Sequence, residues 1–216
     1  MTGQPTLVLG SASPARLKTL RAAGLDAEVI VSGVDESVVE ATRGDELAGV
    51  LARMKAEAVA ARLLAEPSAD RRLVIGCDSV LEFHGTVYGK PADAADAVRR
   101  WQKMRGRSGV LHTGHCVLDV AAGAASTGVA ALARAQAVAG TVVHFADIDD
   151  AEIEAYVATG EPLAVAGAFT IDGLGGPFVE RIEGDPGTVV GLSLPLLRRL
   201  LAQLGVRVTD LWRPAG

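Results

Sequence analysis

The 216-residue sequence has little of several features, and each scarcity excludes a class of protein. Its only cysteines, Cys77 and Cys116, form no CxxC pair, which excludes a disulfide scaffold and a cysteine-rich metal site. No apolar run approaches the ~18 residues that cross a membrane, and no secretory signal is recognisable, so we expect no membrane partner. Basic runs are absent and the net charge is −5, so a nucleic-acid polymer is not an expected partner.

What remains is the composition of an ordinary globular protein. Apolar residues make up 49% of the chain, charged residues 22% and aromatic residues only 4%, which predicts a mostly aliphatic core. The length suits one domain, and neither a linker nor an internal repeat divides it, so we predict a single domain over residues 1–216. Without an export signal we expect a cytoplasmic protein whose thiols are reduced and buried.

Apolar periodicity predicts a mixed α/β fold, with a twisted sheet and flanking helices. The segment Leu73–Leu81 is apolar at most positions, which indicates a strand buried on both faces and central in the sheet. Residues 163–191 are rich in glycine and are expected to be irregular. The expected strands are 6–9, 26–31, 73–81, 86–88, 110–120 and 129–145, and the expected helices are 14–23, 44–66, 92–104, 150–159 and 194–204.

The segment Gly10–Arg16 joins the first strand to the first helix and predicts an anion-binding site. Ser13 suits the N-cap and Pro14 the first helical position, so unpaired N–H groups and the positive end of the helix dipole would meet there. Ser11 adds a hydroxyl, and Arg16 adds a cation one turn into the helix. An ordinary strand–helix junction has the same pattern, so this segment alone does not decide between the two.

Asp78 lies in the most apolar strand, where a carboxylate is costly to bury unless it is paired, protonated or bound to metal. This position predicts a metal ligand or a general base, and the alternative is an aspartate that caps a turn. Glu36 and Asp35 lie at the exit of another predicted strand. Carboxylates from separate strand ends are a common way to hold Mg²⁺, with phosphates and water completing its shell.

Two lysines are candidates for phosphate contacts. Lys55 lies near the apolar stripe of its helix, and Lys90 lies between a glycine and a proline. Each alone is more simply a solvated charge. With Arg16, a helix N-terminus and two carboxylates, they predict a site for phosphates and a divalent cation.

Other motifs point to structural roles. His112 and His115 are three residues apart on a predicted strand, so they face opposite sides and make a poor metal pair. The glycine-rich run Gly173–Gly176 precedes a strand-like segment rather than a helix, so it predicts a tight turn instead of a dinucleotide-binding or phosphate-binding loop. Ser11 and Ser13 have no identifiable histidine base, which gives triad chemistry little support.

Ordered blocks along almost the whole chain resemble the Maf family. This resemblance implies an elongated α/β fold similar to that of the inosine-triphosphate pyrophosphatases, with the site in a cleft between two lobes. It also implies an enzyme, often a homodimer, that splits nucleoside triphosphates into the monophosphate and diphosphate with Mg²⁺ or Mn²⁺. The blocks are Ser11–Arg16, Val34–Glu36, Lys55–Ala56, Cys77–Val80, Gly89–Pro91, Tyr156–Pro162, Ala166–Gly173 and Val190–Pro195.

The resemblance implies roles for individual residues. Asp78 matches the family's proton acceptor and would also hold metal, together with Glu36. Lys55 and Lys90 match its phosphate-binding lysines. Arg16 and the turn Ser11–Ser13 would neutralise the triphosphate, so Ser11, Ser13 and Arg16 are predicted to bind substrate.

Three positions depart from the family pattern that is associated with thymidine and uridine triphosphates. Ala15 replaces an arginine, Ser79 a threonine and Asp172 a glutamine. Ser79 and Asp172 are still predicted to contact substrate, and Asp172 offers only acceptors where glutamine both donates and accepts. The preferred nucleobase therefore stays open.

Two further functions remain open from the sequence. One is a nucleotide-binding regulator of cell division or septum formation with little turnover, and the other is a phosphatase that removes only the γ-phosphate. The products separate the three: diphosphate indicates the pyrophosphatase, orthophosphate the phosphatase, and binding without product the regulator.

Overall fold

The computed structural model describes residues 4–39, 41–66, 70–121 and 128–212. A seven-stranded sheet has the order β2-β1-β3-β5-β6-β7, and β4 also pairs with β3. Strand β1 runs parallel to β2 and β3, and the other pairs are antiparallel, so the predicted mixed sheet with a central third strand is confirmed. The strands are β1 (Thr6–Leu9), β2 (Ala27–Val29), β3 (Arg72–Phe83), β4 (Thr86–Tyr88), β5 (Ser108–Val120), β6 (Ala133–Phe145) and β7 (Val179–Glu183).

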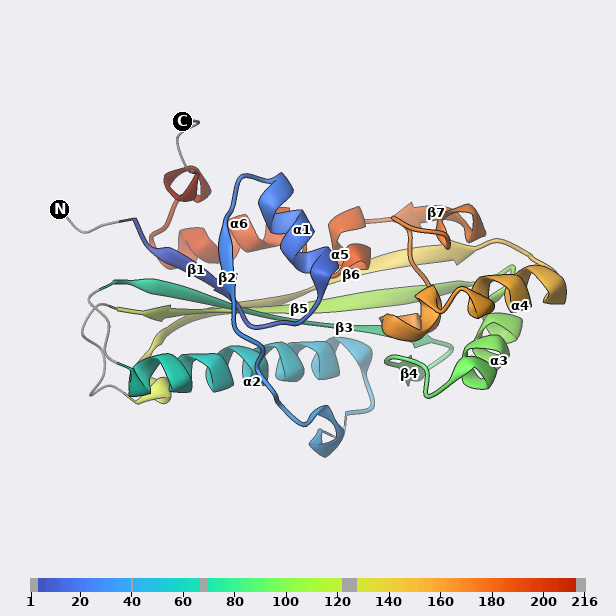
Figure 1. Cartoon of the computed structure of the whole chain (residues 1–216), viewed down its shortest axis with the longest axis horizontal. Helices are drawn as coiled ribbons and strands as arrows, with labels where there is room; N and C mark the ends of the chain where they lie inside the picture. The colour runs from blue at the N-terminus through green and yellow to red at the C-terminus, as the bar shows by residue number, and fades with distance from the viewer. Residues whose placement is uncertain (1–3, 40, 67–69, 122–127, 213–216) are drawn as a thin grey trace.

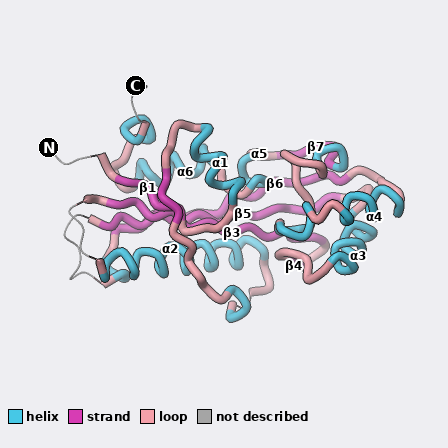
Figure 2. Tube along the Cα trace, viewed as in Figure 1, coloured by secondary structure: helices cyan, strands magenta, loops and turns pink. Residues whose placement is uncertain are grey.

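Helices cover both faces of this sheet (Figure 1). Helix α2 runs along one face, α1, α5 and α6 lie on the other, and α3 and α4 lie together at the end of the sheet beside β4 (Figure 2). None of the helices in the described ranges has the length and apolar composition needed to cross a bilayer. The helices are α1 (Pro14–Ala22), α2 (Gly44–Ala65), α3 (Ala94–Met104), α4 (Asp150–Ala158), α5 (Pro186–Val190) and α6 (Leu194–Gln203).

The segment 163–191, expected to be irregular, contains strand β7 and helix α5; β7 begins in the strand-like segment expected after the glycine-rich run, whereas α5 was not predicted. Strand β7 is half-exposed at the sheet edge, and its sequence VERIE lacks a clear apolar alternation. Helix α5 has only five residues, two of them proline and glycine, which carry little helical signal. In β6 the strand begins at Ala133 rather than Val129, because Val129–Ala131 forms a 3₁₀ turn.

The core divides into clusters at the two ends of the sheet. The clusters around β1 are aliphatic, one on each face. The cluster between the far end of the sheet and helices α3 and α4 contains Trp101, Phe145 and Tyr156, whose rings meet edge to face at 5.6 and 5.7 Å from Trp101. All four phenylalanines lie in or against this cluster. The prediction of a mostly aliphatic core is therefore right only for the end of the sheet around β1.

Both cysteines are free and buried, as predicted. Cys77 belongs to the cluster on the α6 face and Cys116 to the cluster on the α2 face, so the sheet separates the two thiols. Burial raises the pKa of Cys77 to about 11 and that of Cys116 to about 12. Both are therefore protonated core residues rather than nucleophiles.

Helix α2 lies unusually close to the sheet. A Cβ atom at Gly76 of β3 would meet the Ala52 carbonyl oxygen at 2.2 Å, and one at Gly114 of β5 would meet the Ala48 carbonyl oxygen at 2.1 Å. Only glycine fits at these two positions, because helix backbone occupies the space of a side chain. This approach brings the side chains of α2 directly onto β3 and β5.

His115 connects β5 to the start of α6 and has the structural role that the sequence predicts. Its Nε2 accepts the Ser193 N–H at 2.9 Å, and its Nδ1 lies 3.0 Å from the Thr113 carbonyl oxygen. Burial lowers the pKa of His115 from 6.5 to about 4. The ring is therefore neutral in the folded protein over most of the acidic range.

We predict that His115 makes the protein less stable as pH falls from about 6.5 to about 4. In this window the unfolded chain binds a proton at His115 and the folded chain does not, so the free energy of unfolding decreases by up to ~3 kcal/mol. Above this window the residue contributes no pH dependence. Urea denaturation across the window should show a weaker pH dependence in His115→Gln than in the wild type.

The matched control is His84→Asn. His84 is exposed and has a φ of 49°, a backbone conformation that asparagine tolerates. This variant should keep the wild-type pH dependence. The role assigned to His115 is contradicted if His115→Gln also keeps it.

Candidate functional site

The candidate site lies at a stretch of β3 that lacks a strand neighbour on one side. Pairing of β1 with β3 ends at Leu9–Ile75, and pairing of β4 with β3 begins at Leu81–Tyr88. Between these points, in the described part of the chain, no strand pairs with residues 76–80 along that side of β3. Asp78 and Ser79 lie in this open stretch and, as consecutive strand residues, point to opposite faces of the sheet.

The start of α1 lies beside the open stretch because the chain turns into this helix directly after β1. Ser13 is the N-cap, its side chain accepting the Arg16 N–H at 3.5 Å, and Pro14 is the first helical residue. The Ser13 N–H donates to Ser11 Oγ at 3.2 Å. The predicted capped strand–helix junction is therefore confirmed, and it directs the helix N-terminus at this edge of the sheet.

Arg16 ties three separate segments together on one face of β3. Its guanidinium donates to Ser11 Oγ at 2.9 Å, to Ser79 Oγ at 3.1 Å and to the Gly191 carbonyl oxygen at 2.8 Å. The residue is only 8% exposed, and within the described ranges it forms no ion pair with a carboxylate. All its partners are neutral, so Arg16 brings a nearly buried positive charge that a bound anion can neutralise.

The Arg16 contact with Ser79 is supported from the neighbouring strand. Ser79 Oγ lies 2.8 Å from Thr113 Oγ1, and Thr113 Oγ1 donates to the Thr188 carbonyl oxygen at 2.7 Å. Thr113 is directly opposite Ser79 in the register of β3 and β5. This chain of hydroxyl groups links Ser79 of β3 to Thr113 of β5 and to helix α5.

Lys55 joins the two predicted metal ligands on the other face of β3. Its Nζ contacts Asp78 Oδ1 and lies 2.7 Å from Glu36 Oε1. Lys55 and Asp78 are buried, whereas 54% of the Glu36 side chain is exposed. Burial raises the pKa of Asp78, and the opposing charges of Lys55 and Arg16 limit that rise.

The carboxylates of Asp78 and Glu36 fit a divalent metal only together with a phosphate. They come from different elements and converge on one cationic atom, Lys55 Nζ, so this region can accept a cation. The described residues contain no cluster of three or more carboxylate, histidine or cysteine ligands. Mg²⁺ and similar ions are held by one or two carboxylates when substrate phosphates and water supply the other oxygens.

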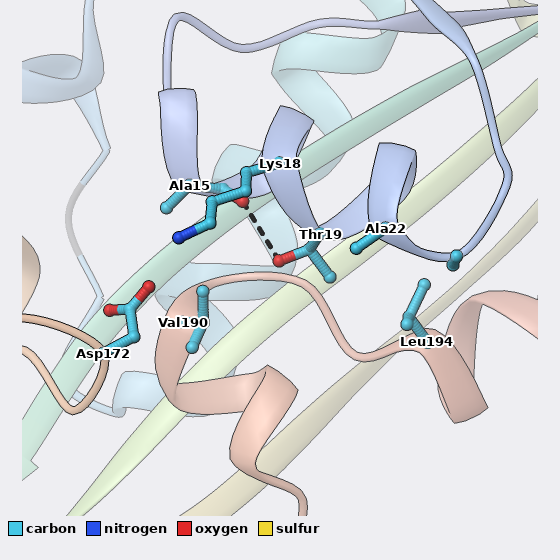
Figure 3. Close-up of a pocket in the computed structure, with 8 residues that line it drawn as sticks. Ala15, Lys18, Thr19, Ala22, Asp172, Val190 and Leu194 are labelled. Carbon is cyan, nitrogen blue, oxygen red and sulfur yellow. Dashed lines mark hydrogen bonds between the residues drawn. The ribbon is translucent and has the colours of Figure 1, made fainter.

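Asp172 lies in a pocket between α1 and the α5–α6 junction rather than among these groups (Figure 3). The pocket has a volume of about 300 Å³, and the Asp172 carboxylate and the Lys18 ammonium point toward one another in it. Ala15 lines the same pocket, whereas Ser79 contacts Arg16 instead. The lining residues are Ala15, Lys18, Thr19, Ala22, Ala23, Asp172, Val190 and Leu194.

Lys90, like Asp172, is a predicted site residue that the structure does not bring to the cluster of Arg16, Lys55 and Asp78. It is exposed in the turn after β4, where its carbonyl oxygen accepts a hydrogen bond from Arg100 at 3.3 Å. Its ammonium forms no hydrogen bond or ion pair with any residue in the described ranges. Its role in phosphate binding stays a prediction.

Sequence reasoning missed three residues that shape the site. Thr113 and the Gly191 carbonyl oxygen contact Ser79 and Arg16 only because of long-range pairing, which no local pattern reveals. Lys18 had a usable signal, since it lies three residues after Ala15 and therefore on the same helix face.

Comparison with known proteins identifies the family of this chain. The sequence model of the family described as Maf-like protein matches residues 6–204. A "Nucleoside triphosphate pyrophosphatase" of Salinispora tropica is 68% identical over 95% of this chain and 87% of its own length. One of Streptomyces coelicolor with the same name is 57% identical over 100% of this chain and 99% of its own length.

A solved structure also aligns, more weakly. It is described as a nucleoside-triphosphatase, dITP/XTP pyrophosphatase, from Mycobacterium abscessus, with a TM-score of 0.33 and 11% identity over 66% of this chain and 75% of that one. So low a score carries no argument here. The family match over nearly the whole chain and the identity to both relatives are decisive: this chain belongs to the Maf-like protein family.

Proposed function

We propose that this protein hydrolyses nucleoside 5′-triphosphates to the nucleoside monophosphate and diphosphate. The names of its relatives at 68% and 57% identity support this activity. The main structural support for this activity is the arrangement of side chains at the edge of β3. Arg16 has no carboxylate partner there in the described chain, and Lys55 joins Asp78 to Glu36. An arginine that forms no ion pair in the described chain, close to two carboxylates, suits a triphosphate bound with a divalent metal.

Arg16 and the N-terminus of α1 would bind the triphosphate and stabilise the charge that develops as it is cleaved. The guanidinium is already fixed by Ser11, Ser79 and Gly191, so it needs little reorganisation during the reaction. Charge accumulates on the departing diphosphate when the bond to the α-phosphorus breaks. A fixed cation and helix N–H groups at that point lower the barrier.

Asp78 would orient the attacking water and accept its proton. Its burial raises its pKa, which makes it a stronger base than an exposed aspartate, while Lys55 keeps it in place. Asp78 and Glu36 would hold Mg²⁺ or Mn²⁺. Such an ion, when bound, neutralises phosphate oxygens and activates water. Lys55 would keep both carboxylates directed at one point.

We predict that Asp78→Asn lowers kcat/KM by on the order of 10³-fold, because the amide cannot accept the proton. The matched control is Asp119→Asn. Asp119 also lies on a central strand and pairs with an arginine, Arg71, at 2.6 Å, but its strand partner Leu73 is far along β3 from Asp78. The control should keep near-normal activity, and near-normal diphosphate release by Asp78→Asn would show that another group is the base.

Product analysis tests the proposed reaction itself. Canonical and modified nucleoside triphosphates should yield monophosphate and diphosphate in equal amounts with Mg²⁺ or Mn²⁺, and activity should stop when a chelator removes the metal. Release of orthophosphate alone would replace the proposal with a γ-phosphatase. Tight binding without any product would favour the nucleotide-binding regulator, which the names of these two relatives do not indicate.

Two accompanying expectations are part of this proposal. The cytoplasmic location is consistent with two free, buried thiols. The homodimer implied by the family resemblance stays a prediction, which sedimentation of the purified protein can check.

A further inference from the structure

Glu161, which lies outside the cluster at the edge of β3, accepts four hydrogen bonds through its carboxylate. It follows helix α4, and donors from two places converge on its carboxylate. Tyr156 Oη donates to Oε1 at 3.1 Å, and Thr170 Oγ1 donates to the same oxygen at 2.5 Å. The backbone N–H of Gly175 donates to Oε1 at 3.0 Å and that of Leu174 donates to Oε2 at 2.9 Å. One carboxylate thus holds both ends of the turn Thr170–Gly175.

The glycine-rich run fits this carboxylate and its neighbour closely. A Cβ at Gly173 would lie 2.5 Å from Glu161 Oε2, and one at Gly175 would lie 2.3 Å from Tyr156 Oη. Only glycine allows the turn to wrap around Glu161 at these distances. The run therefore has a tight-turn role, as its sequence context predicts, and the partner of that turn is Glu161.

Tyr156 anchors the arrangement in the core. Its ring is buried and packs edge to face against Trp101 and Phe178 at 5.7 and 5.3 Å. Glu161 therefore connects two parts of the structure. Tyr156 fixes it to the aromatic cluster, and its carboxylate in turn fixes the turn Thr170–Gly175. The middle of that turn carries Asp172, which reaches the pocket against α1 (Figure 3).

We propose that Glu161 is a positioning residue, which fixes the turn Thr170–Gly175 so that Asp172 lines the pocket beside α1 and contacts the bound nucleotide. This inference rests on the proposed function, since it assigns the pocket to the substrate. Glu161 does not line the pocket, so it acts only through the turn. Its loss should weaken substrate binding and leave the chemical step at Asp78 intact.

Two substitutions of Glu161 should weaken substrate binding to different degrees. In Glu161→Gln the amide oxygen can keep the three donors on Oε1, but the new NH₂ group faces the Leu174 N–H, so one hydrogen bond is lost. In Glu161→Ala all four are lost. We expect KM to rise about tenfold in Glu161→Ala and less in Glu161→Gln, with kcat nearly unchanged in both.

A double-mutant cycle with Asp172→Ala separates positioning from general stability. If Glu161 acts by placing Asp172, Glu161→Ala should cost little binding in a chain that already lacks the Asp172 carboxylate. The control is Glu152→Ala, which removes one of the two hydrogen bonds of the capping box at the start of α4, the end of the helix away from Glu161. It should lower thermal stability while leaving KM unchanged.

Binding is measured separately from turnover, using α,β-methylene analogues of the four ribonucleoside triphosphates, which resist cleavage at the proposed bond. Weaker binding of the favoured analogue by Glu161→Ala, with faster amide exchange at Leu174 and Gly175, supports the proposal. Unchanged binding by Glu161→Ala, or by Asp172→Ala, overturns it. Wild-type protein that binds an analogue but releases no diphosphate from triphosphates contradicts the proposed function alone.

Discussion

The structure of this site depends on a nearly buried arginine that has no carboxylate partner among the described residues. Arg16 holds the start of α1 through Ser11, the open stretch of β3 through Ser79, and the α5–α6 junction through the Gly191 carbonyl oxygen. Three neutral acceptors orient the guanidinium without neutralising it. Burying such a charge is unfavourable in free energy, and charge-assisted hydrogen bonds to a bound phosphate group would offset that cost.

The opposite face of β3 depends on how closely α2 approaches the sheet. Gly76 and Gly114 present no Cβ to the helix, so Lys55 can reach Asp78 from within a packed interface. Packing and chemistry are therefore coupled here, because the glycines that bring the helix close also place the lysine between Asp78 and Glu36. The two faces meet only where β1 has ended and β4 has not begun, so the lengths of these short strands define the site.

Local signals in the sequence predicted much of this arrangement. The cap at Ser13 and the central position of β3 follow from residue patterns within a few positions, and both are confirmed. Contacts set by long-range register were not predictable, such as Thr113 opposite Ser79. The same holds for Glu161, whose donors include the backbone of a turn ten or more residues away. The glycine and proline that flank Lys90 constrain its backbone and say nothing about where its ammonium lies.

The central claim is that Arg16 is a preformed partner for the substrate's phosphates. Calorimetric binding of inorganic triphosphate tests it most directly, because this ligand has no base or sugar to contact the pocket beside α1. We expect Arg16→Gln to bind it about 10- to 100-fold more weakly than the wild type, the effect of losing hydrogen bonds to a charged group. Equal affinities, with both proteins folded, would contradict the claim.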